Sequence, residues 1–383
     1  MRILALAVLF TVGCAAPKAT VTRKALPRVR PEAAQAVRDA ARLYRLGPSY
    51  FGQAKERLEA AVQSSPQLFE AWFDLGRIDF AESRLEAAEL AFGKALELLP
   101  SDRATVLALG EVRQADGKAD AAIKLYRTFL DRNEAKRVDG ENNEMKLALG
   151  SALRRAKKYD AATEIIREVL RRQPRSAAAL DGLGLVYLDR GNTELADLVL
   201  HRAFDIVEND HERAKEAARI ANNLGLVALK RRRADEAFAY FDQAERLDPT
   251  LTVARRNKAL TYLDCGDYAR AAEELADLVK SAPRDVDAWV ALGVAERGRA
   301  QFDVAARAFD RALELDPHSA DALYDLALLQ MDFLRKPAHV RELLERFLKV
   351  APANHAKRAD AQARISDLDQ KSKPRTEPKG GAS

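Results

Sequence analysis

Histidine, cysteine and acidic side chains are the groups of this chain that could carry catalysis or bind a metal, and they are scattered. No two of the five histidines have the spacing that would place both rings on one helix face as metal ligands. His211 and Glu212 begin like a zinc-peptidase motif, but Lys215 stands where the second histidine is needed. The histidines are His201, His211, His318, His339 and His355. The sequence therefore predicts no metal site.

Other motifs of enzyme chemistry are incomplete. Gly110 and the pair Gly117-Lys118 suggest a phosphate-binding loop, but the spacing is wrong and Ala119 stands where serine or threonine is needed. No Gly-x-Ser-x-Gly nucleophile elbow occurs in the sequence. Cys265 falls at an expected turn, and we interpret it as a free thiol. We therefore predict that the protein is not an enzyme and uses no cofactor and no small-molecule substrate.

The composition is typical of a folded, helix-rich protein. Hydrophobic residues make up 48% of the 383 residues, enough for a substantial core, and the 32% of charged residues with few aromatics favours helix. Lysine and arginine number 63 against 58 acidic residues, and the formal net charge is only +5. Such a mild excess does not indicate a nucleic-acid partner, which usually requires a concentrated basic stripe. Two cysteines cannot build a disulfide framework.

The first residues have the features of an export signal. After a short basic start, Ile3–Val12 is almost wholly apolar, too short to span a bilayer but suited to the apolar region of a secretory signal. Thr11–Cys14 resembles the bacterial lipobox, and the resemblance implies cleavage before Cys14 and acylation of this cysteine. Ala15 follows rather than aspartate, which by the bacterial sorting rule implies an outer-membrane lipoprotein. An ordinary signal with an incidental cysteine is the alternative.

The two ends of the chain are therefore expected to lie outside any core. Residues 1–13 form the predicted signal peptide, and residues 14–31 form a lipidated tether in which prolines and five cations occur without an acid. The tether is a solvated spacer, a contact for anionic lipid headgroups, or both. Residues 371–383 have the composition of a disordered tail. The predicted location is the bacterial cell envelope, on the outer membrane facing the periplasm.

A repeat of about 34 residues organises the rest of the chain. One column of small residues recurs at spacings of 34, 40, 34, 41, 34, 34 and 34, namely Gly76, Gly110, Gly150, Gly184, Gly225, Ala259, Gly293 and Ala327. Twelve residues after seven of these comes an alanine, and a proline ends most repeats. Glu134 and Glu208 replace that proline where the spacing stretches, so long connections are expected at 131–142 and 205–217. The second could lengthen a helix by nearly two turns.

Each column has a physical role in a pair of packed helices. Apolar or small residues at offsets of three and four form one stripe, in which a small residue lets a second helix approach closely. Gly117, Gly191 and Gly266 lie between paired helices, where a positive φ is needed. The pattern resembles the tetratricopeptide repeat family over residues 52–352. The resemblance implies an all-α, right-handed superhelical solenoid of about eight helix-turn-helix hairpins, with the array at 67–352.

Two further segments complete the expected architecture. Residues 32–66 are predicted to form an irregular first repeat. Residues 353–370 are predicted to form the capping helix that a solenoid end requires, with Ala359, Ala363 and Ile365 able to pack against the array.

The resemblance also implies that the first helix of each hairpin lines a concave face. Residues three before, one after and four after the small column should face this groove, and in the later repeats most of them are apolar. Asn223 and Asn257 lie two before the column, where an asparagine of this family often holds a ligand's peptide backbone. Arg219 and Arg256 could add charge selectivity. The apolar candidates are Leu185, Leu188, Leu226, Leu229, Leu260, Leu263, Val290 and Val294, for which packing between hairpins is the alternative.

The expected ligand is an apolar or amphipathic segment of another protein, because the basic clamp for a free terminal carboxylate is incomplete. We therefore predict a lipid-anchored periplasmic scaffold or adaptor that binds protein partners through its groove. It would act in assembly of an envelope machine, such as a pilus, secretion, gliding-motility or outer-membrane assembly system. Two alternatives stay open: an accessory activator of a cell-wall enzyme, or a soluble co-chaperone if the lipobox is not used.

Overall fold

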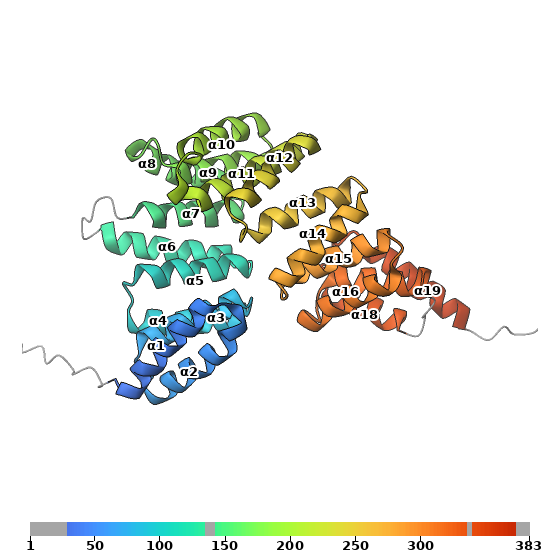
Figure 1. Cartoon of the computed structure of the whole chain (residues 1–383), viewed down its shortest axis with the longest axis horizontal. Coiled ribbons are helices and arrows are strands. Elements are labelled where there is room, and N and C mark those ends of the chain that lie inside the picture. Colours follow the sequence, from blue (N-terminus) through green and yellow to red (C-terminus); the bar gives the residue numbers. More distant parts are fainter. Residues whose placement is uncertain (1–28, 135–141, 335–338, 373–383) are drawn as a thin grey trace, which may run out of the picture. The chain divides into compact units, whose positions relative to one another are not determined.

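A computed structural model describes residues 29–134, 142–334 and 339–372, and every regular element in these ranges is helical (Figure 1). The prediction of an all-α fold is confirmed. Cys14, the signal peptide and nearly all of the tether lie outside the described residues, as does the tail from residue 373. The chain divides into two compact units at Leu75, inside helix α3 (Phe69–Ala81), and we describe each unit by itself.

The first unit is a helical hairpin followed by the start of α3. Helix α1 (Pro31–Leu46) begins with a proline, whose fixed φ suits a first helical position, and ends at Gly47 with a φ of 108°. A short 3₁₀ turn, η1 (Pro48–Tyr50), leads into α2 (Phe51–Ser64). Ala40, Ala54 and Leu58 are buried between the two helices. This hairpin occupies the segment for which an irregular first repeat was predicted.

The second unit continues the alternation of first and second helices. Consecutive helices pack antiparallel, and each hairpin packs on the next (Figure 1). The helices are α4 (Leu85–Leu98), α5 (Arg103–Ala115), α6 (Ala119–Glu134), α7 (Asn143–Arg155), α8 (Tyr159–Arg172), α9 (Ala177–Asp189), α10 (Thr193–Val207), α11 (Ala214–Lys230), α12 (Ala234–Leu247), α13 (Thr252–Asp264), α14 (Tyr268–Ser281), α15 (Val286–Gly298), α16 (Phe302–Leu315), α17 (Ala320–Asp332), α18 (Val340–Val350) and α19 (Arg358–Ser372). A short 3₁₀ turn, η2 (His211–Arg213), precedes α11.

The small-residue column marks where the two helices of a hairpin touch. A Cβ added to Gly293 would lie 2.5 Å from Phe309, and one added to Gly225 would lie 2.5 Å from Phe241. Both phenylalanines are fully buried. At these two positions the column holds glycine because the facing ring occupies the space of a methyl group.

The turns inside the hairpins need a left-handed residue. Gly117, Gly191 and Gly266 have φ values of 70°, 79° and 78°, which confirms the predicted positive φ. In four other hairpins a non-glycine residue adopts this conformation at φ near 59°. These are Ser83, Lys157, Arg232 and Ala300.

The second stretched repeat is accommodated differently from the expectation. Helix α11 has 17 residues, whereas the first helices α5, α7, α9 and α13 have 13, so it is longer by about one turn rather than two. The remaining extra residues form the connection with η2. Part of the other long connection, 135–141, lies outside the described residues.

The last helix packs by a different face than predicted. Ala361 of α19 is fully buried, and Ile365 and Leu368 pack against the core of the last hairpins. Ala359 and Ala363 are exposed, so the expected contact holds for Ile365 alone. The spacing of four and three residues is that of one helix face.

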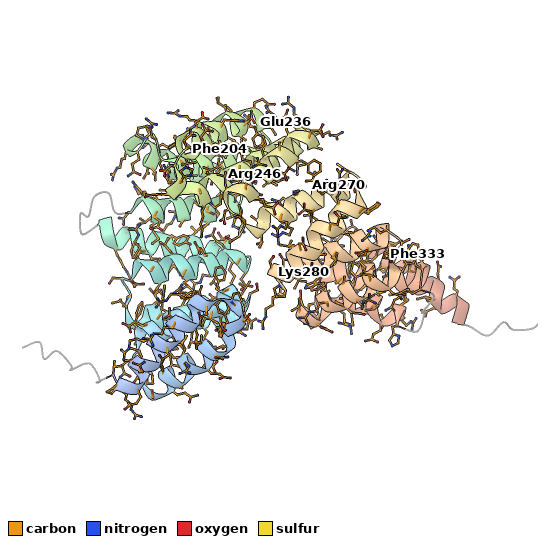
Figure 2. The ribbon with its side chains drawn as sticks, in the orientation of Figure 1. Phe204, Glu236, Arg246, Arg270, Lys280 and Phe333 are labelled. Atoms are coloured by element: carbon orange, nitrogen blue, oxygen red, sulfur yellow. The ribbon has the colours of Figure 1, made fainter. Side chains whose placement is uncertain are left out.

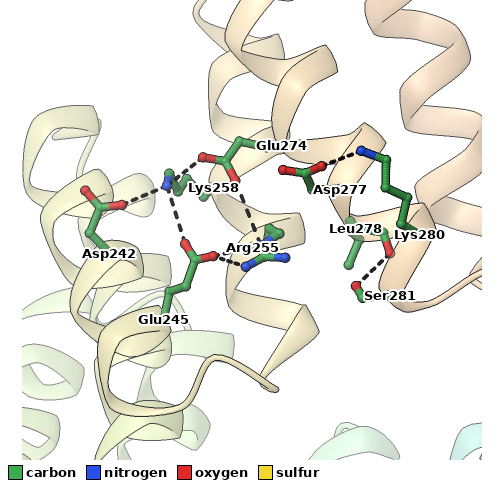
Figure 3. Close-up of polar contacts among 9 residues, drawn as sticks. All are labelled: Asp242, Glu245, Arg255, Lys258, Glu274, Asp277, Leu278, Lys280 and Ser281. Carbon is green, nitrogen blue, oxygen red and sulfur yellow. Dashed lines mark hydrogen bonds and ion pairs between the residues drawn. The ribbon is translucent and has the colours of Figure 1, made fainter.

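Helix α13 buries few residues and also makes ion pairs to both neighbouring second helices. Only Ala254, Ala259 and Thr261 of this helix are buried. Lys258 of α13 lies between two second helices, with its Nζ 2.9 Å from Asp242 of α12 and 2.7 Å from Glu274 of α14 (Figure 3). Ion pairs therefore hold α13 to both of these helices.

Candidate partner-binding groove

The first helices α5, α7, α9, α11 and α13 line a groove with a volume of about 830 Å³. Its floor is apolar, because half-buried leucines from four of these helices meet there: Leu107, Leu147, Leu185 and Leu226. A second hollow of about 950 Å³ adjoins it at the carboxyl ends of the same helices, and we call this hollow the mouth. Arg154, Leu188, Asp189 and Leu226 line both. The groove and the mouth are therefore continuous.

Seven of the residues predicted from the sequence lie in this continuous site. Six line the groove, and Leu229 lines the mouth. Two of the six, Leu188 and Asn223, are largely buried and contribute a narrow strip of surface. The six are Leu185, Leu188, Arg219, Asn223, Leu226 and Asn257.

The other five predicted residues lie elsewhere. Arg256 forms an ion pair with Asp285 at 3.0 Å, and Leu260 is 40% exposed outside the groove. Leu263 packs against the core around α14, and Val290 and Val294 pack against the core of the last hairpins. These three line neither the groove nor the mouth, and the apolar strip of the groove ends before α15.

The asparagines bond to one another rather than standing apart. Asn257 donates from Nδ2 to Oδ1 of Asn222 at 2.8 Å, and Asn222 donates to Oδ1 of Asn223 at 3.3 Å. Asn223 donates to Oδ1 of Asp181 at 2.6 Å. This ladder joins α13, α11 and α9 along the groove floor. Each amide nitrogen keeps a second hydrogen, so the ladder can still donate to a bound backbone.

Asp181 is one of the groove residues that the sequence reasoning missed. It occupies the position three before the small column, where the earlier repeats carry Leu107 and Leu147. Only 8% of it is exposed, and burial raises its pKa, partly offset by the hydrogen bond from Asn223 and by Arg219. A carboxyl group that interrupts an apolar column was the available sign of a special position.

Replacing Asp181 with asparagine is expected to preserve the hydrogen bond from Asn223 while removing a buried charge. Because the folded pKa of Asp181 is raised, its ionisation destabilises the fold as pH rises above the unfolded value of about 4. Asp181→Asn should therefore be more stable than wild type at pH 7, by about 1 kcal/mol, and equally stable near pH 4. Urea unfolding at both pH values measures this difference. If the free energy of unfolding of the wild type instead rises relative to that of the variant as pH rises, Arg219 stabilises the carboxylate.

Stacked antiparallel hairpins with a groove between their first helices define the class: an α-helical repeat protein with a surface for binding other proteins. Models of the tetratricopeptide repeat match residues 51–103, 107–174, 147–199, 201–251 and 295–338, and a second such model matches 228–293. These matches cover well over half of the chain. The chain belongs to the tetratricopeptide repeat family.

Individual relatives are similar over the repeats. The chain is 27% identical over 158 residues to anaphase-promoting complex subunit 3 of Schizosaccharomyces pombe, covering 41% of this chain and 23% of that protein. It is 21% identical over 298 residues to the human protein O-mannosyl-transferase TMTC3, covering 77% of this chain and 32% of that protein. The chain thus spans about a quarter to a third of these relatives.

Among solved structures, the APC/C hetero-tetramer Cut9-Hcn1 is similar with a TM-score of 0.52 and 16% identity. The match covers 82% of this chain and 59% of that one, and it supports the fold. None of the helices in the described ranges has the length and apolar character needed to cross a bilayer. Within those same ranges, no three histidine, cysteine or acidic residues are grouped as metal ligands.

Proposed function

We propose that this chain is a lipid-anchored scaffold of the bacterial cell envelope, which holds an apolar or amphipathic segment of a partner protein in the groove. The observation that carries the proposal is the apolar floor, in which Leu185 and Leu226 lie half-buried and partly open to solvent. Burying such leucines under a partner removes apolar surface from water, at about 25 cal/mol per Å². The groove offers this gain at one continuous place.

The polar ladder beside the floor supports recognition of a peptide. Asn257 is half-buried and lines the groove, and its Oδ1 is not used in the ladder. An amide oxygen there can accept a backbone N–H, and the second hydrogens of the ladder can meet a backbone carbonyl. Such contacts suit a main chain of any sequence, while the leucines select apolar side chains.

The anchor and the location rest on the amino-terminal sequence. Cys14 in its lipobox-like setting and the basic tether support attachment to the outer membrane. A scaffold held there would assemble or retain an envelope machine of the pilus, secretion, gliding-motility or outer-membrane assembly type. We propose no intrinsic catalysis, because protein binding by the groove accounts for the architecture of the repeats.

The experiment is crosslinking in cells, followed by membrane fractionation and mass spectrometry, for wild type and two variants. Leu185→Asp/Leu226→Asp should stay in the membrane fraction, but its partner crosslinks should fall at least about tenfold. The reason is that a bound partner would bury the two new carboxylates against apolar side chains, which costs free energy. Cys14→Ser should leave the membrane fraction, because acylation at this residue is the proposed anchor.

The matched control is Leu195→Asp/Leu198→Asp, which changes two leucines of α10 that are 40% and 66% exposed and lie outside the groove. It should keep its crosslinks. Far-UV circular dichroism establishes that each variant is folded. Partners that survive the groove substitutions but disappear with the α10 substitutions would place the binding surface on the second helices and overturn the proposal. If Cys14→Ser stays in the membrane fraction, the lipid anchor at Cys14 is wrong.

A further inference from the structure

Cations gather where the groove opens into its mouth. Arg154, Arg155, Lys157 and Lys230 line the mouth together with a single carboxylate, Asp189. Arg154 is neutralised by Asp189, with Nη1 2.6 Å from the carboxylate. The other three are exposed and form no ion pair with any residue that the structure describes. The mouth therefore carries about three uncompensated positive charges.

Two neighbouring cations that do not line the mouth are paired. Lys158, next to Lys157, lies 2.6 Å from Asp120, and Arg231, next to Lys230, lies 3.0 Å from Asp197. A cation at the carboxyl end of a helix is favourable for the helix dipole, which explains the presence of Arg155 and Lys230 but not their position around one hollow. What sets Arg155, Lys157 and Lys230 apart is that they gather around one hollow that is continuous with the apolar floor.

The opposite end of the groove carries two carboxyl groups. Glu111 of α5 and Glu144 of α7 line it. Glu144 forms an ion pair with Arg103 at 2.6 Å, and burial together with Glu144 raises the pKa of Glu111. Along α7 the site runs from Glu144 to Arg155, a rise of about 16 Å at 1.5 Å per residue. The floor between these ends is apolar. The site thus has unpaired cations gathered at one end of the apolar floor and two carboxyl groups at the other end.

We infer that the groove takes a partner segment with a cluster of acidic residues on one side of its apolar residues, and that this cluster sits in the mouth beside Arg155, Lys157 and Lys230. The inference rests on the proposed function and adds the partner's charge pattern. The chain's own ends do not fit, because residues 15–31 hold five cations without an acid, and residues 373–383 hold three cations and one acid. Complementary charge at one end of a groove fixes the register of a bound segment.

The test uses a phage-displayed library of random peptides, selected in parallel on the full chain and on variants. The charge-reversal variant is Arg155→Glu/Lys230→Glu; Lys157 is left unchanged because its φ of 58° makes substitution there a backbone change as well. The matched control is Arg246→Glu, an exposed residue of the second helix α12 (Figure 2). The apolar-floor variant is Leu185→Asp/Leu226→Asp.

Peptides selected on wild type should combine apolar residues with an acidic cluster on one side. A synthetic copy should bind the charge-reversal variant at least about tenfold more weakly, bind Arg246→Glu normally, and lose affinity as salt rises. Peptides that need Leu185 and Leu226 but show no acidic excess would overturn this inference and leave the proposed function standing. Failure to select any peptide that depends on those leucines would overturn both.

Discussion

Gly293→Ala is expected to destabilise the protein, although alanine is the better helix former. The added methyl would lie 2.5 Å from the ring of Phe309, which is fully buried and has no room to move. Overpacking of this kind costs about 1–3 kcal/mol, against a gain in helix propensity of about 1 kcal/mol. We expect a net loss of up to about 2 kcal/mol, measured as a lower midpoint of urea unfolding by far-UV circular dichroism.

Other repeats of this chain show a combination that accommodates alanine in the column. Where the column holds Ala259 or Ala327, the residue sixteen positions later is Leu275 or Leu343, whereas Gly293 is followed at that distance by Phe309. Gly293→Ala/Phe309→Leu should therefore be more stable than the sum of its single substitutions by at least about 1 kcal/mol.

Gly93→Ala in α4 is the matched control for the glycine substitution. Nothing lies within 4 Å of a Cβ added there, so this variant should be more stable than wild type, by up to about 1 kcal/mol. Equal effects of alanine at Gly93 and Gly293 would contradict the role assigned to the column.

Lys258→Ala is expected to cause the second large loss of stability. Lys258 is 12% exposed, and its Nζ contacts Asp242, Glu245 and Glu274 at 2.9, 3.5 and 2.7 Å (Figure 3). Its removal leaves Glu245 and Glu274 with Arg255 as their cation and takes the ion pair with Lys258 from Asp242. Breaking a buried charge pair costs about 3–5 kcal/mol, and the partial exposure of this one lowers the expectation to about 2–3 kcal/mol. Urea unfolding at neutral pH measures the loss.

The pH dependence and a control follow from the same contacts. Burial opposes the charged form of Lys258, but hydrogen bonds to Glu274 and Asp242 outweigh it and raise the pKa. A raised pKa means that the stabilisation is fully present below the unfolded value of about 10.4 and is lost only at higher pH. The gap between wild type and variant should therefore be the same at pH 7 and pH 9. Lys280→Ala, which removes an exposed pair with Asp277, should leave stability unchanged, and an equal loss there would reject the network as the cause.

The hairpin architecture could be predicted because it is written in short-range patterns. The small column, the alanine column and the turn glycines each concern residues within one repeat, and each has a single physical reason. Gly225 faces Phe241 within the same hairpin, and Gly117 turns the chain between α5 and α6. The packing face of the capping helix α19 was harder to predict, because it depends on which residues of α17 and α18 lie opposite. Ala361 rather than Ala359 is buried there.

Membership of the groove could be predicted only in part. Leu226 and Leu260 stand at the same position relative to the small column, yet Leu226 lines the groove and Leu260 is exposed outside it. Val294 stands at that position too and packs against the last hairpins. Whether a given position faces the groove depends on how each hairpin is rotated against the next. Many side chains from separate repeats set that rotation together.

The sequence by itself determined an all-α array of tetratricopeptide hairpins, where each hairpin turns, and which small residues separate its helices. It did so because these features depend on contacts within one repeat. Only the tertiary structure decided that the groove ends before α15, that Asp181 anchors a ladder of asparagines, and that the unpaired cations of the mouth lie beside an apolar floor. Those features join side chains from different repeats, and their distances are set by packing that no local pattern encodes.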